Sequence, residues 1–175
     1  NPAVNAHVPL VRSFIVTKKK GRDRWAQPII EGNTVRFEVL DGVPPKGQEG
    51  TVVRTGATCI ISGSPIPFEY VREEAQAGRM GAMLMAIVTE GKSGRNYYSP
   101  MTEHVAIAES AVPEWLPMGQ LPEKALSFRV QVYGMDEHYK LFTPRQLVAL
   151  TTFSDLVAEA RAQAQTDALA AGLPT

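Results

Sequence analysis

Alternation of apolar and polar residues predicts three β-strands near the start of the chain. Residues 10–16 are mostly apolar, residues 18–24 are polar and mostly basic, and the apolar pattern then resumes. This arrangement predicts a β-hairpin with a basic tip. Gly32 and Asn33 signal a two-residue turn, because both residue types tolerate a positive φ. Behind them, residues 35–39 alternate between apolar and charged side chains, so we expect a third strand with one buried face.

Proline and glycine divide the middle of the chain into shorter elements. The methionines at 80–85 favour a core strand over a soft binding groove, because methionine fills irregular gaps in a core. The pattern predicts a loop at 41–50, a knuckle-like turn at 59–63, helices at Phe68–Ala75 and Thr102–Ala111, and strands at Met83–Thr89 and Phe128–Val132.

The start of a C-terminal helix is marked clearly. Thr143 is placed to be the N-cap, Pro144 the first helical residue and Gln146 the third, which is a capping box. The helix should carry apolar side chains of residues 150–157 on one face and end before Gly172. Its second half is rich in alanine and is expected to project or to pack only lightly.

These elements predict an α+β fold built from antiparallel β-hairpins, short helices and a long capped C-terminal helix. We expect residues 1–140 to form one domain and the helix of residues 141–172 to pack on it. The longest apolar stretch, Met80–Val88, is far shorter than the roughly 18 residues that would span a bilayer. We therefore expect no membrane partner, and we expect the protein to be located in the cytoplasm.

Composition narrows the classes of function. The chain has 175 residues with 18 Lys and Arg against 18 Asp and Glu, so its formal net charge is zero. A globally basic nucleic-acid-binding protein is excluded, although a local basic patch is not. The single cysteine excludes an internal disulfide and any metal site that takes several thiolates from this chain.

The hairpin tip is the candidate binding site. Five cations surround one carboxylate there, and such a tip can lie along a phosphate backbone and gain affinity by releasing counterions. Arg12 flanks the hairpin and could extend the surface. The alternative is a solvated turn without a ligand. The tip cations are Lys18, Lys19, Lys20, Arg22 and Arg24.

Three segments of the sequence, residues 9–14, 56–63 and 141–153, carry a resemblance to a known family. They resemble the zinc-ribbon insert of the large adenine-specific DNA methylases that contain a zinc ribbon, and the resemblance covers nearly the whole chain. In that family the insert lies between the S-adenosylmethionine-binding motif and the catalytic Asp-Pro-Pro-Tyr motif. Neither motif occurs in this sequence, so the resemblance implies a zinc-ribbon-like domain that supplies contacts and not chemistry.

The metal-binding knuckles of that family are incomplete here. Val4 stands at a cysteine position of the first knuckle, whereas in the second knuckle Cys59 matches and Ser62 replaces the other cysteine. Structural zinc needs four ligands in a tetrahedron, so we expect no zinc and packing in its place. Asn5 and Gly63 follow former ligand positions, and both residue types adopt left-handed backbone easily. The turns are therefore expected to persist without the metal.

The resemblance and the basic tip together give a hypothesis and an alternative. The hypothesis is a non-catalytic DNA-recognition or scaffolding insert of an S-adenosylmethionine-dependent adenine-N6 DNA methyltransferase of restriction-modification or phage defence. Its partners would be DNA, bound weakly through phosphates, or the rest of the methylase, and it would hold no cofactor itself. The alternative is a structural or protein-interaction module without DNA affinity, which contacts the methylase or a second copy of itself. The sequence leaves enzymatic activity of the chain open.

Overall fold

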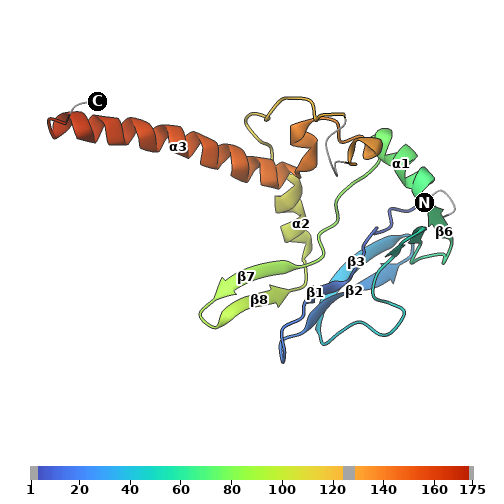
Figure 1. Ribbon diagram of the computed structural model, residues 1–175. Helices are drawn as coiled ribbons and strands as arrows, with labels where there is room; N and C mark the ends of the chain where they lie inside the picture. The colour runs from blue at the N-terminus through green and yellow to red at the C-terminus, as the bar shows by residue number, and fades with distance from the viewer. Residues whose placement is uncertain (1–3, 124–128, 174–175) are drawn as a thin grey trace. The chain divides into compact units, whose positions relative to one another are not determined.

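Short antiparallel sheets and α-helices make up the described part of the chain (Figure 1). The computed structural model describes residues 4–123 and 129–173. The chain divides into two units: residues 1–105 with 132–134 form the first, and residues 106–131 with 135–175 form the second. The predicted α+β class and the long C-terminal helix are confirmed.

The first sheet contains three antiparallel strands in the order β1-β2-β3. Strands β1 (Ile15–Thr17) and β2 (Arg24–Glu31) form the predicted hairpin, and β3 (Thr34–Asp41) pairs with β2 along its whole length. The turn between β2 and β3 places Gly32 at a φ of 61°. This left-handed conformation is the one that the turn signal in the sequence required.

The first strand begins later than the apolar stretch at 10–16 predicted. Strand β1 starts at Ile15, because Val11 makes its hydrogen bonds elsewhere. The Val11 carbonyl accepts the Thr51 amide at 2.7 Å, and the Val11 amide donates to Thr51 Oγ1 at 2.8 Å. A contact across 40 residues of sequence therefore engages the backbone of Val11, whereas the Phe14 carbonyl still accepts the Ala26 amide of β2.

One face of the first sheet carries a hydrophobic core. Alternation along β3 buries Val35 and Phe37 and leaves Arg36 exposed. The Phe37 ring centroid lies 6.0 Å from that of Phe14, and both rings are buried. Trp25 of β2 is only 5% exposed and belongs to the same core. It is therefore a packing residue and has no free ring face for stacking on nucleic-acid bases.

A second small sheet leads into the first helix. Strands β4 (Val52–Val53), β5 (Gly56–Thr58) and β6 (Pro65–Pro67) pair in that order, and α1 (Phe68–Gln76) follows β6 directly. The helix starts at the predicted residue and ends before Gly78, which has a φ of 70°. The second core, at the joint between this sheet and α1, contains the buried residues Ala57, Cys59, Ile66 and Val71.

A two-stranded hairpin follows, formed by β7 (Ile87–Gly91) and β8 (Gly94–Tyr98). The expectation of a strand from Met83 was wrong at its start. Because Ile87 pairs with Tyr98, continuing β7 backwards would place Met85 opposite Pro100. Proline has no amide to donate, so the ladder cannot extend there.

The methionine run is accordingly not a core strand. Met80 is 48% exposed and Met83 is 38% exposed, and only Met85 packs against the first core. All three line a cavity of about 310 Å³, together with the segment around Val8 and with Phe37. The other interpretation of the sequence, a methionine-lined groove, therefore describes these residues better than a core strand does.

Helix α2 (Thr102–Glu109) starts where predicted and ends two residues earlier than Ala111. The strand expected at 128–132 is not formed by its described residues, and Phe128 lies outside them. Gln131–Tyr133 instead form a 3-10 turn that ends at Gly134, whose φ is 75°. Tyr133, in this turn, packs against the second core.

The long helix α3 (Pro144–Ala170) begins with the predicted capping box. The Gln146 amide donates to Thr143 Oγ1, and the Thr143 amide donates to Gln146 Oε1 at 2.8 Å. The helix ends before Gly172, which has a φ of 74° and whose amide donates to the Leu169 carbonyl. Among the residues that the structure describes, no helix combines the length and the apolar character needed to cross a membrane.

Candidate nucleic-acid interface

The turn between β1 and β2 holds the predicted basic tip. Lys18, Lys19 and Lys20 are all exposed, and the Arg22 amide closes the turn by donating to the Lys19 carbonyl at 2.6 Å. None of the ion pairs within the described ranges involves these three lysines. Their ammonium groups therefore lie in solvent without a carboxylate that neutralises them.

The two arginines predicted at the tip have different roles. Arg24 Nε lies 2.7 Å from Asp41 Oδ1, and the Arg24 side chain is only 30% exposed. Arg24 is therefore already paired with a carboxylate of the neighbouring strand. Arg22 instead donates from Nη1 to the Ser93 carbonyl at 2.7 Å. Because a carbonyl carries no formal charge, Arg22 keeps its positive charge.

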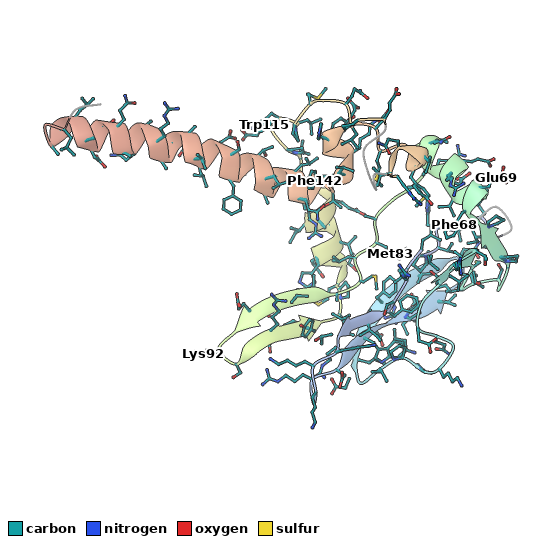
Figure 2. All side chains as sticks on the ribbon, in the orientation of Figure 1. Phe68, Glu69, Met83, Lys92, Trp115 and Phe142 are labelled. Atoms are coloured by element: carbon teal, nitrogen blue, oxygen red, sulfur yellow. The ribbon has the colours of Figure 1, made fainter. Side chains whose placement is uncertain are left out.

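The hydrogen bond from Arg22 links the tip to a second turn. Ser93 lies in the two-residue turn between β7 and β8, next to Lys92, and Arg95 follows on β8. Figure 2 marks Lys92 at the end of this hairpin, and Figure 1 shows the turns of both hairpins on the same side of the first unit. Lys92 and Arg95 are exposed. They were not among the predicted site residues, although the signal of a basic turn was present in the sequence.

Arg12 precedes the hairpin strand β1, which begins at Ile15. Its side chain is exposed, while its backbone packs closely on Gly50: a Cβ added there would lie 2.5 Å from the Arg12 carbonyl oxygen. Arg12 thus lies outside β1 and beside Gly50, and it is not part of the turn that carries the three lysines.

Two of the three positions that the family resemblance aligns with metal ligands, Val4 and Cys59, lie together in the second core. Val4 packs against the cluster that contains Cys59, and Cys59 is fully buried. The Ser62 amide donates to Cys59 Sγ at 3.4 Å, while Ser62 itself is exposed. An apolar side chain and a thiol thus fill the space between the two turns.

Both turns keep the backbone geometry expected of the knuckles. Asn5 has a φ of 45° and Gly63 a φ of 72°, and each directly follows a position that the family resemblance aligns with a metal ligand. The Gly63 amide donates to the Cys59 carbonyl at 2.8 Å, and the Cys59 amide donates to the Ser64 carbonyl at 2.9 Å. Backbone hydrogen bonds therefore hold the second turn closed.

Side chains that could share a metal ion are dispersed. Across residues 4–123 and 129–173, no group of three or more His, Cys, Asp and Glu side chains is placed to hold one. His104 accepts the Met101 amide through Nδ1 at 3.1 Å at the start of α2. His138 Nδ1 lies 2.9 Å from the Gly119 carbonyl oxygen, to which it donates. Both histidines are thus engaged in local turns.

A groove of about 650 Å³ runs between the segment at residues 5–10 and helix α1. One wall carries an ion pair in which Arg79 contacts both carboxylate oxygens of Glu74 at 2.7 Å. Hydrogen bonding to Arg79 lowers the pKa of Glu74, whereas partial burial and the nearby Glu74 carboxylate raise the pKa of Tyr70. The opposing charges cancel, so the groove offers no excess charge to a ligand.

Comparisons with models of protein families, with curated proteins and with solved structures found no match to this chain. Its function is therefore inferred from its own residues and their geometry.

Proposed function

We propose that this chain is a non-catalytic DNA-recognition or scaffolding insert of a cytoplasmic, S-adenosylmethionine-dependent adenine-N6 DNA methyltransferase. The observation that carries the proposal is the β1–β2 turn, which exposes Lys18, Lys19 and Lys20 without a neutralising carboxylate within the described residues. The chain as a whole has no net charge. Its affinity for a polyanion must therefore come from a local surface of this kind.

A phosphate backbone suits this turn for a physical reason. Duplex DNA carries a dense row of negative charges with condensed counterions, and each lysine that neutralises a phosphate releases some of them. Long, flexible lysine side chains contact phosphates as point charges and do not read bases. Weak, salt-dependent binding that is indifferent to sequence is expected. Arg24 is left out of this surface because Asp41 already pairs with it.

The knuckle-like turns support the scaffolding part of the proposal. The turns at Asn5 and Gly63 have left-handed backbone, and Val4 packs with Cys59 where metal ligands would meet in a zinc ribbon. Apolar packing and backbone hydrogen bonds can replace a metal as the link between two turns. On this proposal the chain holds neither zinc nor S-adenosylmethionine, and the cofactor binds elsewhere in the methylase.

A salt titration tests the proposal. Binding of a fluorescent mixed-sequence duplex is measured by anisotropy at increasing salt, for the unmodified chain and for a variant with Lys18, Lys19 and Lys20 all changed to Ala. Each lost contact should reduce the slope of log affinity against log salt by about 0.9, so the triple variant should lose between two and three. Arg54→Ala is the control, because Arg54 is exposed in the turn between β4 and β5. An equal slope for the triple variant and the control would refute the proposal.

Exposed apolar residues on α3 favour the alternative, a protein-interaction module. Leu150 is 48% exposed, Phe153 69% and Val157 70%, and they lie on the face that the sequence predicted to be apolar. Such residues can dock a helix against a partner. The interaction-module proposal would replace the DNA-recognition proposal if two results were found together. The unmodified chain would bind no DNA, and Phe153→Lys would abolish its association with the methylase or with a second copy.

A further inference from the structure

Two basic turns of the first unit are joined by one side chain. Arg22 reaches from the β1–β2 turn and donates to the carbonyl of Ser93, 71 residues further along the chain. A Cβ added to Gly94 would lie 3.4 Å from Arg22 Nη1, so the guanidinium rests directly on the β7–β8 turn. The contact therefore brings the two turns together, although 71 residues separate them in the sequence.

The second turn adds charge of the same sign as the first. Lys92 occupies its tip and Arg95 follows on β8, and neither takes part in an ion pair found among the described residues. Glu90, opposite Arg95 in the register, is the carboxylate of this hairpin. The two turns together expose more cations than carboxylates, in a chain whose formal charge is zero.

We infer that the β7–β8 turn is the second half of a single surface for the phosphate backbone of duplex DNA, with Lys92 and Arg95 as further phosphate contacts and Arg22 as the positioning residue between the halves. The inference rests on the proposed function and extends it to residues that are remote in sequence. Arg22 suits the task because its planar guanidinium holds a fixed hydrogen-bond geometry. Its acceptor is a neutral carbonyl, so the bond leaves the local positive potential intact.

Holding the turns together has an energetic reason. A flexible pair of turns would lose conformational freedom when a polyanion binds to both, and this loss would weaken binding. With Arg22 bonded to Ser93, the turns are ordered before binding. Removing Arg22 should therefore weaken DNA binding by more than the loss of one charge would, because Lys92 and Arg95 would no longer be held beside the first turn.

Single substitutions in the same salt titration separate the roles. Lys92→Ala and Arg95→Ala should each reduce the slope by about 0.9, whereas Arg54→Ala should leave it unchanged. Arg22→Ala should reduce it by two or more. In a double-mutant cycle, Arg22→Ala with Lys92→Ala should reduce the slope no further than Arg22→Ala alone. Circular dichroism and urea unfolding of each variant verify that the fold is retained.

The outcomes distinguish this inference from the proposed function. If the lysine triple variant lowers the slope but Lys92→Ala behaves like Arg54→Ala, the first turn binds DNA and the second does not, and the inference fails alone. Additive effects of Arg22→Ala and Lys92→Ala would make Arg22 an ordinary phosphate contact and overturn its positioning role. If neither turn affects the slope, or if the unmodified chain binds no duplex at all, both proposals fall.

Discussion

Replacing Gly63 with alanine tests the knuckle-like turn that keeps Cys59 buried. Gly63 has a φ of 72°, and nothing lies within 4 Å of the position that a Cβ would take. The cost is therefore conformational and not steric. A left-handed backbone costs a residue with a Cβ roughly 1–2 kcal/mol. Part of this cost is offset, because alanine lowers the conformational entropy of the unfolded chain and thereby stabilises the fold by about 0.4–1 kcal/mol. A net loss of about 0.5–1.5 kcal/mol in the free energy of unfolding is expected.

Urea unfolding followed by the fluorescence of buried Trp25 measures this loss. Trp115, the second tryptophan, lies in the second unit, where it donates to Asp155 of the same unit. A Trp115→Phe background therefore restricts the signal to the first unit. The midpoint should fall while the dependence on urea stays constant, because the substitution does not change the surface exposed on unfolding.

Gly81 provides the matched control. A Cβ there would also meet nothing within 4 Å, but the φ of Gly81 lies outside the left-handed range. Gly81→Ala should therefore be neutral or stabilising. Gly63→Asn should fall between, because asparagine tolerates the conformation that Asn5 adopts in the other turn. Equal stability of the two alanine variants would show that the turn does not need its left-handed residue.

Three further predictions concern the cap of α3, the groove and the buried Cys59. Thr143→Ala should lower the free energy of unfolding by about 1 kcal/mol and with it the melting temperature, whereas Thr143→Ser should keep the cap to Gln146. Glu74→Gln should destabilise the chain at neutral pH, and the difference from the unmodified chain should vanish in acid. Because pairing with Arg79 lowers the pKa of Glu74, this pairing stabilises the fold above the usual carboxyl pKa and is lost as the pH falls through the lowered value. Urea unfolding at several pH values measures the effect. The folded chain should contain no stoichiometric zinc by elemental analysis, and Cys59 should react with a thiol reagent only after urea is added; about one zinc per chain, with unfolding by a chelator, would contradict this.

Local sequence patterns determined the elements whose stabilising contacts lie close in sequence. The capping box at Thr143 and Gln146 joins residues three positions apart, so the start of α3 could be predicted. The alternation along β3 also placed Val35 and Phe37 in a core without knowledge of its other wall. The left-handed turn at Gly63 was expected from the residue type together with the resemblance to a metal-binding knuckle. In each case the physical cause lies within one turn or one strand.

Only the tertiary structure decided the features that depend on distant partners. The strand expected from Met83 begins at Ile87 because Pro100, across the hairpin, would end the ladder. Val11 leaves the first sheet because Thr51 offers its backbone a partner 40 residues away. The basic tip could be predicted from a run of charges in the sequence. Its link to the turn that holds Lys92 depends on the hydrogen bond from Arg22 to Ser93, 71 residues away. Such contacts depend on the path of the whole chain, which no local pattern encodes.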